Sequence, residues 1–353
     1  MKEFMILFKM IINYLFYIFF LMNSNKMFFM FTLFFSTLIS ISSNSWFGCW
    51  IGLEINLLSF IPLISNSKNL FSSEASLKYF LIQSIASINF LFIILLKMLF
   101  MNLEMNVIIS IMMNSTLLMK MGSAPFHFWF PNIMEGLSWL NCFILMTWQK
   151  ISPMILLSYY FYSKFLIIIL ILNVIIGAIG GLNQTSLRKL MAFSSINNLG
   201  WMLSSIMISE NLWMFYFMFY SFLNSLLCMM FFLFNIYFIN QLFIINLNNM
   251  IKLSIMINFL SLGGLPPFIG FFPKWMVINF LLKNNFFILT FIFVMMSLIM
   301  LLYYIRIIYS SLMFNYFKLK WFKINIKNNS FFWINFLSMI SLLGMITSTF
   351  FYL

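Results

Sequence analysis

The sequence has little charge and few of the residue types that build soluble active sites. Of its 353 residues, 7% are charged and 64% are hydrophobic, and the mean hydropathy is +1.05. Because soluble domains carry roughly 25% charged residues, this composition excludes a soluble fold. The chain contains no aspartate, and its acidic residues number 6 against 19 basic ones, which gives a formal charge of +13. In so apolar a chain, an excess of lysine predicts membrane orientation and not nucleic-acid binding.

The scarcity of cysteine and histidine excludes further classes of site. Cys49, Cys142 and Cys228 lie far apart in apolar segments, and the chain has a single histidine. Without a Cys-x-x-Cys pair or a Cys/His cluster, the sequence predicts no metal site and no iron–sulfur cluster. It also lacks the spaced glycines of a dinucleotide fold and of a phosphate-binding loop, which argues against a nucleotide site.

Long apolar runs recur along the whole chain, and they predict an all-α polytopic membrane protein with about eleven transmembrane helices. We expect the spans at 27–43, 45–63, 75–98, 107–134, 138–160, 164–183, 191–208, 211–240, 254–283, 286–314 and 330–352. Residues 1–26 are interpreted as an N-terminal extension, whose apolar part could form a twelfth or an interfacial helix, or as the result of a mis-assigned start, with the true start at Met22. No signal-peptide cleavage site follows them. Residues 27–353 are then expected to form a single transmembrane domain.

Basic residues are distributed unevenly among the expected loops. The loops after even-numbered spans hold most of them: Lys68, Arg188, Lys189, Lys252, Lys318, Lys320, Lys323 and Lys327. By the positive-inside rule these loops face the cytoplasm or its equivalent, which is the matrix in a mitochondrion.

A ten-residue frame, G-x-x-P-F-x-x-x-F-P, occurs twice, at 122–131 and at 264–273. Glycine and proline interrupt helices. An interrupted helix is tolerated in lipid only where protein or water satisfies its freed backbone groups. The frames therefore predict two broken helices, near 107–134 and 254–283, and matched breaks in two halves of a membrane protein indicate an ion or substrate path.

Four ionisable residues lie inside the expected spans: Glu54, Lys120, Lys150 and Lys274. Each costs about 2.5–3.5 kcal/mol to insert, so four together indicate a function. Burial disfavours the charged form, which allows a lysine to accept and donate protons. The sequence thus predicts a proton relay in which Glu54 is the counter-ion of one lysine. Snorkelling of a lysine to the interface is the structural alternative.

Two further positions have open interpretations. His127, inside the first frame, either passes protons between lysines or donates a hydrogen bond to a carbonyl freed at the break. Glu74 and Lys78 are spaced i,i+4, which predicts either a simple surface pair or a role at a channel mouth.

These residues lie in stretches that resemble the mitochondrially encoded subunit 2 family of respiratory complex I, NADH:ubiquinone oxidoreductase, in its arthropod-like form. The resembling stretches include GLEIN around Glu54, GSAPFHFWFP after Lys120, WQK at Lys150 and PKW at Lys274, and they extend from about residue 44 to residue 310. The resemblance implies an antiporter-like membrane-arm subunit with inverted repeats. It also implies that Glu54 pairs with Lys120, that Lys150 links two half-channels and that Lys274 lies on the exit side.

The resemblance has further implications. Lys78 matches a lysine of the family, whereas Asn198 stands where the family usually has histidine, which puts a proton role there in doubt. No cofactor is expected in this chain, since NADH, flavin, iron–sulfur clusters and ubiquinone are handled by other subunits. The expected partners are other membrane-arm subunits, protons and the lipid bilayer of the mitochondrial inner membrane, with no nucleic acid.

Two other functions remain as alternatives from the residues alone. One is a free-standing cation/proton antiporter, although a sodium site prefers oxygen ligands and the chain lacks aspartate. The other is a membrane scaffold in which the lysines only pair with their neighbours. The position of the lysines adds a hypothesis: Lys120 precedes its break and Lys274 follows its own, as suits an inlet half and an outlet half.

Overall fold

The computed structural model describes residues 24–66, 69–99, 106–244 and 249–313, together with 336, 338–339 and 341–342. These residues are mostly helical, and apart from an isolated bridge between Ser186 and Phe238 no strand occurs among them. Seven described segments are long and apolar enough to cross a membrane, and one of them, Trp139–Tyr159, is made of two consecutive helices. The expected polytopic all-α membrane fold is therefore confirmed. Most of the N-terminal extension and almost all of the expected span 330–352 lie outside the described residues.

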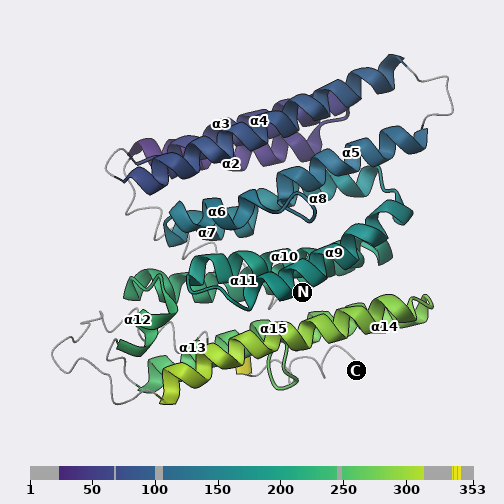
Figure 1. Ribbon diagram of the computed structural model, residues 1–353. Coiled ribbons are helices and arrows are strands. Elements are labelled where there is room, and N and C mark those ends of the chain that lie inside the picture. Colours follow the sequence, from purple (N-terminus) through teal and green to yellow (C-terminus); the bar gives the residue numbers. More distant parts are fainter. Residues whose placement is uncertain are drawn as a thin grey trace. The chain divides into compact units, whose positions relative to one another are not determined.

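The helices form two compact units, residues 1–169 and residues 170–353. The first unit contains α2 (Ser24–Ser42), α3 (Trp46–Ile64), α4 (Leu70–Leu99), α5 (Asn106–Met121), α6 (Trp129–Gly136), α7 (Trp139–Met146) and α8 (Trp148–Tyr159). Within it, α3 packs between α2 and α4, and α4 packs on both α5 and α6 (Figure 1). Helix α8 packs on α5 and α2.

The second unit is built from the end of α9 (Ser163–Gly181), which begins in the first unit, and from six further helices. These are α10 (Leu187–Ile208), α11 (Glu210–Phe234), α12 (Ile239–Ile244), α13 (Asn249–Gly263), α14 (Phe271–Lys283) and α15 (Phe287–Met313). Helix α11 packs on α10, α13 and α14, and α15 lies along both α13 and α14 (Figure 1).

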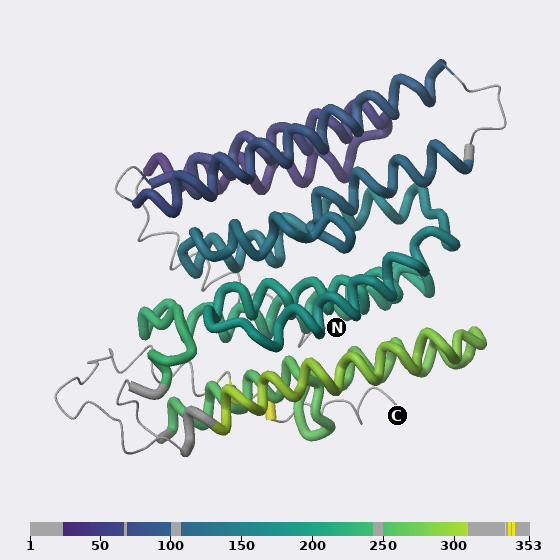
Figure 2. The backbone as a smooth tube through the Cα atoms, viewed as in Figure 1, coloured from purple at the N-terminus to yellow at the C-terminus, as the bar shows by residue number. Residues whose placement is uncertain are grey.

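Both predicted breaks are present. Helices α5 and α6 lie end to end, with residues 122–128 between them, and α13 and α14 do the same around residues 264–270 (Figure 2). Lys120 is the penultimate residue of α5, before its break, whereas Lys274 is in the first turn and a half of α14, after its break.

The expected span 211–240 was wrong at its end. Helix α11 ends at Phe234, because Asn235 adopts a left-handed conformation with φ 53° and its N–H bonds the last turn. Asparagine tolerates this conformation better than most residues do. The chain then turns into the separate short helix α12.

The expected span 138–160 contains an interruption that the sequence analysis did not predict. Helix α7 ends at Met146 and α8 begins at Trp148, with Thr147 between them at φ −115° and ψ −73°. The Thr147 hydroxyl donates to the carbonyl of Phe143 at 2.7 Å, a bond that is known to bend helices. Pro153 follows in α8 and, because it has no N–H, leaves the Gln149 carbonyl without its helical donor.

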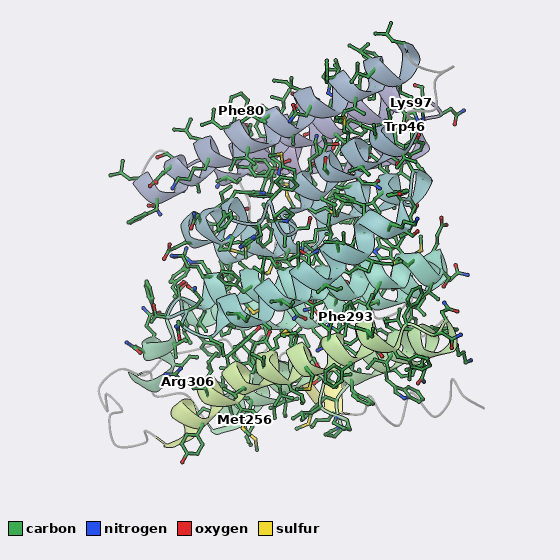
Figure 3. The ribbon with its side chains drawn as sticks, turned by 45° about the vertical axis from the view of Figure 1, so that its right-hand side comes forward. Trp46, Phe80, Lys97, Met256, Phe293 and Arg306 are labelled. Atoms are coloured by element: carbon green, nitrogen blue, oxygen red, sulfur yellow. The ribbon has the colours of Figure 1, made fainter. Side chains whose placement is uncertain are left out.

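Large apolar side chains cover the outer face of the first unit, as expected for contact with lipid. Phe80 projects outward from α4 (Figure 3). Near the end of the same helix, the Lys97 ammonium lies 5.2 Å from the ring centre of Trp46 and 4.3 Å from that of Tyr160. A cation between two aromatic rings gains cation–π attraction, and this combination is typical of the membrane–water interface.

Candidate functional site

Both frames begin where a helix ends, and the two helices end with the same backbone conformation. Gly122 follows α5 with φ 70° and Gly264 follows α13 with φ 84°, a region that glycine enters without steric cost. In each case the next N–H bonds the carbonyl five residues earlier: Ser123 to Leu118 at 3.1 Å, and Leu265 to Leu260 at 3.3 Å. This is the Schellman ending, and it explains why each frame begins with glycine.

The last proline of each frame has a matching explanation. Pro131 is the third residue of α6 and Pro273 is the third residue of α14. The first turn of a helix has N–H groups with no helical partner, so a residue without an N–H is tolerated there. At both breaks, therefore, a glycine ends the first half-helix and a proline lies in the first turn of the second.

At the first break, neutral side chains satisfy the freed carbonyls. The indole N–H of Trp129 donates to Met119 at 3.2 Å, and the amide of Gln83 donates to the Lys120 carbonyl at 3.2 Å. Nδ1 of His127 lies 3.2 Å from the Pro125 carbonyl, so it is the donor in that bond. Because these groups satisfy the backbone, the Lys120 ammonium is not needed to end α5.

At the second break, the lysine itself satisfies the backbone. Lys274 Nζ donates to the carbonyl oxygens of Leu262 at 3.0 Å and Gly263 at 2.9 Å, the last two residues of α13. A cation at a helix C-terminus is also stabilised by the helix dipole. Lys274, buried in the second unit, thus joins α14 to the end of α13.

Two glycines leave the space that Lys274 needs to reach the end of α13. A Cβ atom on Gly264 would lie 2.9 Å from Cδ and 3.0 Å from Nζ of Lys274, so any larger residue would displace the ammonium. A Cβ on Gly270 would lie 1.7 Å from the Ser261 carbonyl oxygen, so the chain can return against α13 only with glycine there. The corresponding residue of the first frame, Phe128, is exposed.

In the first unit, Glu54 of α3 and Lys120 of α5 are electrostatic partners without touching. Lys120 is buried, and the charge of Glu54 acts on its ammonium. No contact ion pair joins Glu54 and Lys120, whereas Lys78 and Glu74 on α4 do form one. One carboxylate oxygen of Glu54, Oε2, is buried without a hydrogen-bond partner. The expected pairing is therefore an interaction at a distance, between groups that no direct bond holds together.

Lys150 lies deep in the same unit, directly after the interruption at Thr147. Its side chain is 1% exposed, and Nζ lies 5.3 Å from the ring centre of Phe130. Phe130 in turn packs on Gly122, where an added Cβ would lie 3.0 Å from the Phe130 side chain. Phe130 therefore lies against both Lys150 and the glycine that begins the first break.

A hydrogen bond ties the helices of Glu54 and Lys150 together. The Gln149 amide donates to Asn56 Oδ1 at 2.9 Å, and these residues are neighbours of Lys150 and Glu54 in sequence. The first unit thus brings Glu54, Lys120 and Lys150 onto connected helices. Lys274 belongs to the second unit.

The remaining candidates have simpler surroundings. Lys78 Nζ lies 2.6 Å from Glu74 on an exposed face of α4, and exposed pairs of this kind contribute little to stability. No group of three or more metal-binding side chains occurs in the described part of the chain. Two residues that the sequence analysis did not single out also belong to these sites: Gln83, which supports Lys120, and Tyr216, whose hydroxyl donates to Asn198 Oδ1 at 3.0 Å.

Comparison with known proteins agrees with this architecture. Residues 43–300 match a protein family described as "NADH:quinone oxidoreductase/Mrp antiporter, TM". The NADH-ubiquinone oxidoreductase chain 2 of Anopheles gambiae is 56% identical over 303 residues, covering 84% of this chain and 89% of that protein. The chain of the same name from Aedes aegypti is 52% identical over 323 residues, covering 90% and 95%.

A solved structure shares the fold. A chain of respiratory complex I from Thermus thermophilus with bound aureothin superposes with a TM-score of 0.80 at 20% identity, covering 93% of this chain and 80% of that one. The family model and the insect relatives together cover both broken helices. The chain belongs to the NADH:quinone oxidoreductase/Mrp antiporter membrane family and, within it, to the NADH-ubiquinone oxidoreductase chain 2 proteins.

Proposed function

We propose that this chain translocates protons as a membrane-arm subunit of NADH:ubiquinone oxidoreductase in the mitochondrial inner membrane, with Glu54, Lys120, Lys150 and Lys274 as the proton-transfer groups. The observation that carries the proposal is a buried lysine beside each of two matched helix breaks. Other subunits handle NADH, flavin, iron–sulfur clusters and ubiquinone. The partners are those subunits and the surrounding lipid.

In the first unit, burial of Lys120 disfavours a charge there, and the negative charge of Glu54 opposes that effect. Since no direct bond holds the two groups together, a small change in local charge shifts this balance. A proton that arrives at Lys150 or leaves it is such a change. The cation–π attraction of the Phe130 ring, worth about 0.5–2 kcal/mol, stabilises the charged form of Lys150.

In the second unit, Lys274 holds its proton against two backbone carbonyls. Release of the proton leaves an amine with two N–H groups in place of three, and it removes the positive charge from the C-terminus of α13. Proton release is therefore coupled to the bonds that end this half-helix. His127 has a structural part in this proposal, because it donates to Pro125. Lys78 lies outside the relay's core, since Glu74 binds its ammonium on an exposed face.

The two lysines stand on opposite sides of their breaks, which supports different parts for the two units. Lys120, which is not used as a cap, is suited to exchange protons readily in an inlet half. Lys274, bound by two carbonyls, is suited to a slower outlet half.

The test is Lys120→Ala in the assembled complex, with Lys164→Ala as the matched control because Lys164 is exposed at the start of α9. We expect Lys120→Ala to lower proton pumping and coupled NADH oxidation at least tenfold, and Lys164→Ala to leave both unchanged. Complex content, measured on native gels, separates lost transport from lost assembly. Normal pumping by a fully assembled Lys120→Ala complex would contradict the proposal and favour the alternative of a membrane scaffold.

A further inference from the structure

A small cavity lies beside Lys274 in the second unit. Its volume is about 10 Å³, and its lining includes Lys274, Tyr216 and Asn198. A space of this size holds about one water molecule, provided that polar groups are present to bind it. The lining contains such groups on three helices, α10, α11 and α14.

The hydroxyl of Tyr216 has a fixed orientation. The Asn198 amide nitrogen donates to the Ser194 carbonyl at 3.0 Å, so Asn198 Oδ1 must point to the other side, toward Tyr216. Tyr216 donates its proton to that oxygen at 3.0 Å. Since a hydroxyl has one proton, the Tyr216 oxygen can act toward the cavity only as an acceptor.

Lys274 supplies the complementary donor. An ammonium has three N–H groups, and two of them bond the Leu262 and Gly263 carbonyls. Among the described residues no protein acceptor takes the third. A donor from Lys274 and an acceptor from Tyr216 therefore line one cavity large enough for a water.

We propose that this cavity binds one water molecule, held between Lys274 Nζ and the Tyr216 hydroxyl, and that this water accepts the proton that Lys274 releases. In the transfer, the N–H bond breaks with its electron pair left on nitrogen, and a lone pair of the water forms the new O–H bond. Tyr216 is a positioning residue, oriented by Asn198. The inference rests on the proposed function, since it assigns the first acceptor in the path from Lys274.

The first test is a high-resolution electron cryo-microscopy map of the wild-type complex, which requires no variant. We expect ordered density within hydrogen-bond distance of both Lys274 Nζ and Tyr216 Oη. Absence of density there would overturn the inference. It would leave the proposed function standing, because that function is tested separately by the pumping of the Lys120→Ala complex.

The second test compares Tyr216→Phe with Tyr159→Phe, a control at an exposed tyrosine. We expect Tyr216→Phe to lose the water density and to lower coupled NADH oxidation about tenfold, the effect of one hydrogen bond of about 1.4 kcal/mol. The solvent deuterium isotope effect on that rate should rise, which a purely structural defect would not cause. Asn198→Leu, which frees the hydroxyl to rotate, should act in the same direction. An unchanged isotope effect in both variants would contradict the positioning role.

Discussion

Lys274 Nζ lies 2.9 Å from the carbonyl oxygen of Gly263, so the lysine after the second break binds the half-helix that precedes it. Lys120, at the first break, has no such bond, because Gln83 and Trp129 satisfy the carbonyls there. The two breaks share their glycine and proline positions but differ in what satisfies the backbone. This difference separates the effects of mutating the two lysines.

Lys274→Met is expected to destabilise the chain more than Lys120→Met does. The first substitution leaves two buried carbonyls unsatisfied, at about 1–3 kcal/mol each, whereas the second leaves none. Both should stop proton pumping. The thermal stability and the amount of assembled complex, measured side by side for the two variants, give the comparison. Equal stability of the two would show that Lys274 is not needed to end α13.

Gly264→Ala is expected to impair pumping although it leaves every ionisable residue in place. Alanine at φ 84° costs about 1–2 kcal/mol, and its Cβ would displace the Lys274 ammonium from its two carbonyls. The control is the neighbouring Gly263→Ala, whose Cβ would meet no atom closer than 3.5 Å. Pumping and thermal stability should fall for the first variant only. A similar loss in both would contradict the steric argument.

Glu54→Gln is expected to lower pumping while the fold is preserved, since the side chain keeps its shape and loses only the charge that acts on Lys120. Glu74→Gln is the control, because it removes the charge of an exposed pair worth about 0.2–0.5 kcal/mol. Proton pumping per NADH in reconstituted vesicles would measure the difference. Full activity of the Glu54→Gln complex would remove Glu54 from the relay.

Gln83→Leu is expected to weaken the first break. It removes the donor to the Lys120 carbonyl and leaves that buried group unsatisfied, at about 1–3 kcal/mol. Ser84→Ala, next to it in the chain, serves as the control because its hydroxyl bonds only within its own helix. Thermal unfolding of the complex and its pumping rate should both change for Gln83→Leu. Unchanged values would mean that another donor replaces the amide.

The helices and the two breaks were predictable from sequence because they depend on local properties. Apolar runs produced the spans, and the G-x-x-P-F-x-x-x-F-P frame marked both interruptions where the structure has them. The interruption at Thr147 was missed because a threonine inside an apolar run is compatible with a continuous helix. The end of α11 was missed because one asparagine, Asn235, decides it through its left-handed conformation.

The sequence by itself determined that buried lysines flank two matched breaks, and that Glu54 is the one carboxylate available at their depth. Those features follow from residue type and spacing. Only the tertiary structure decided that Lys274 binds the end of α13, that Lys150 lies beside the ring of Phe130, and that Glu54 acts on Lys120 without touching it. These partners come from different helices or from across a break, and their distances depend on how the half-helices pack.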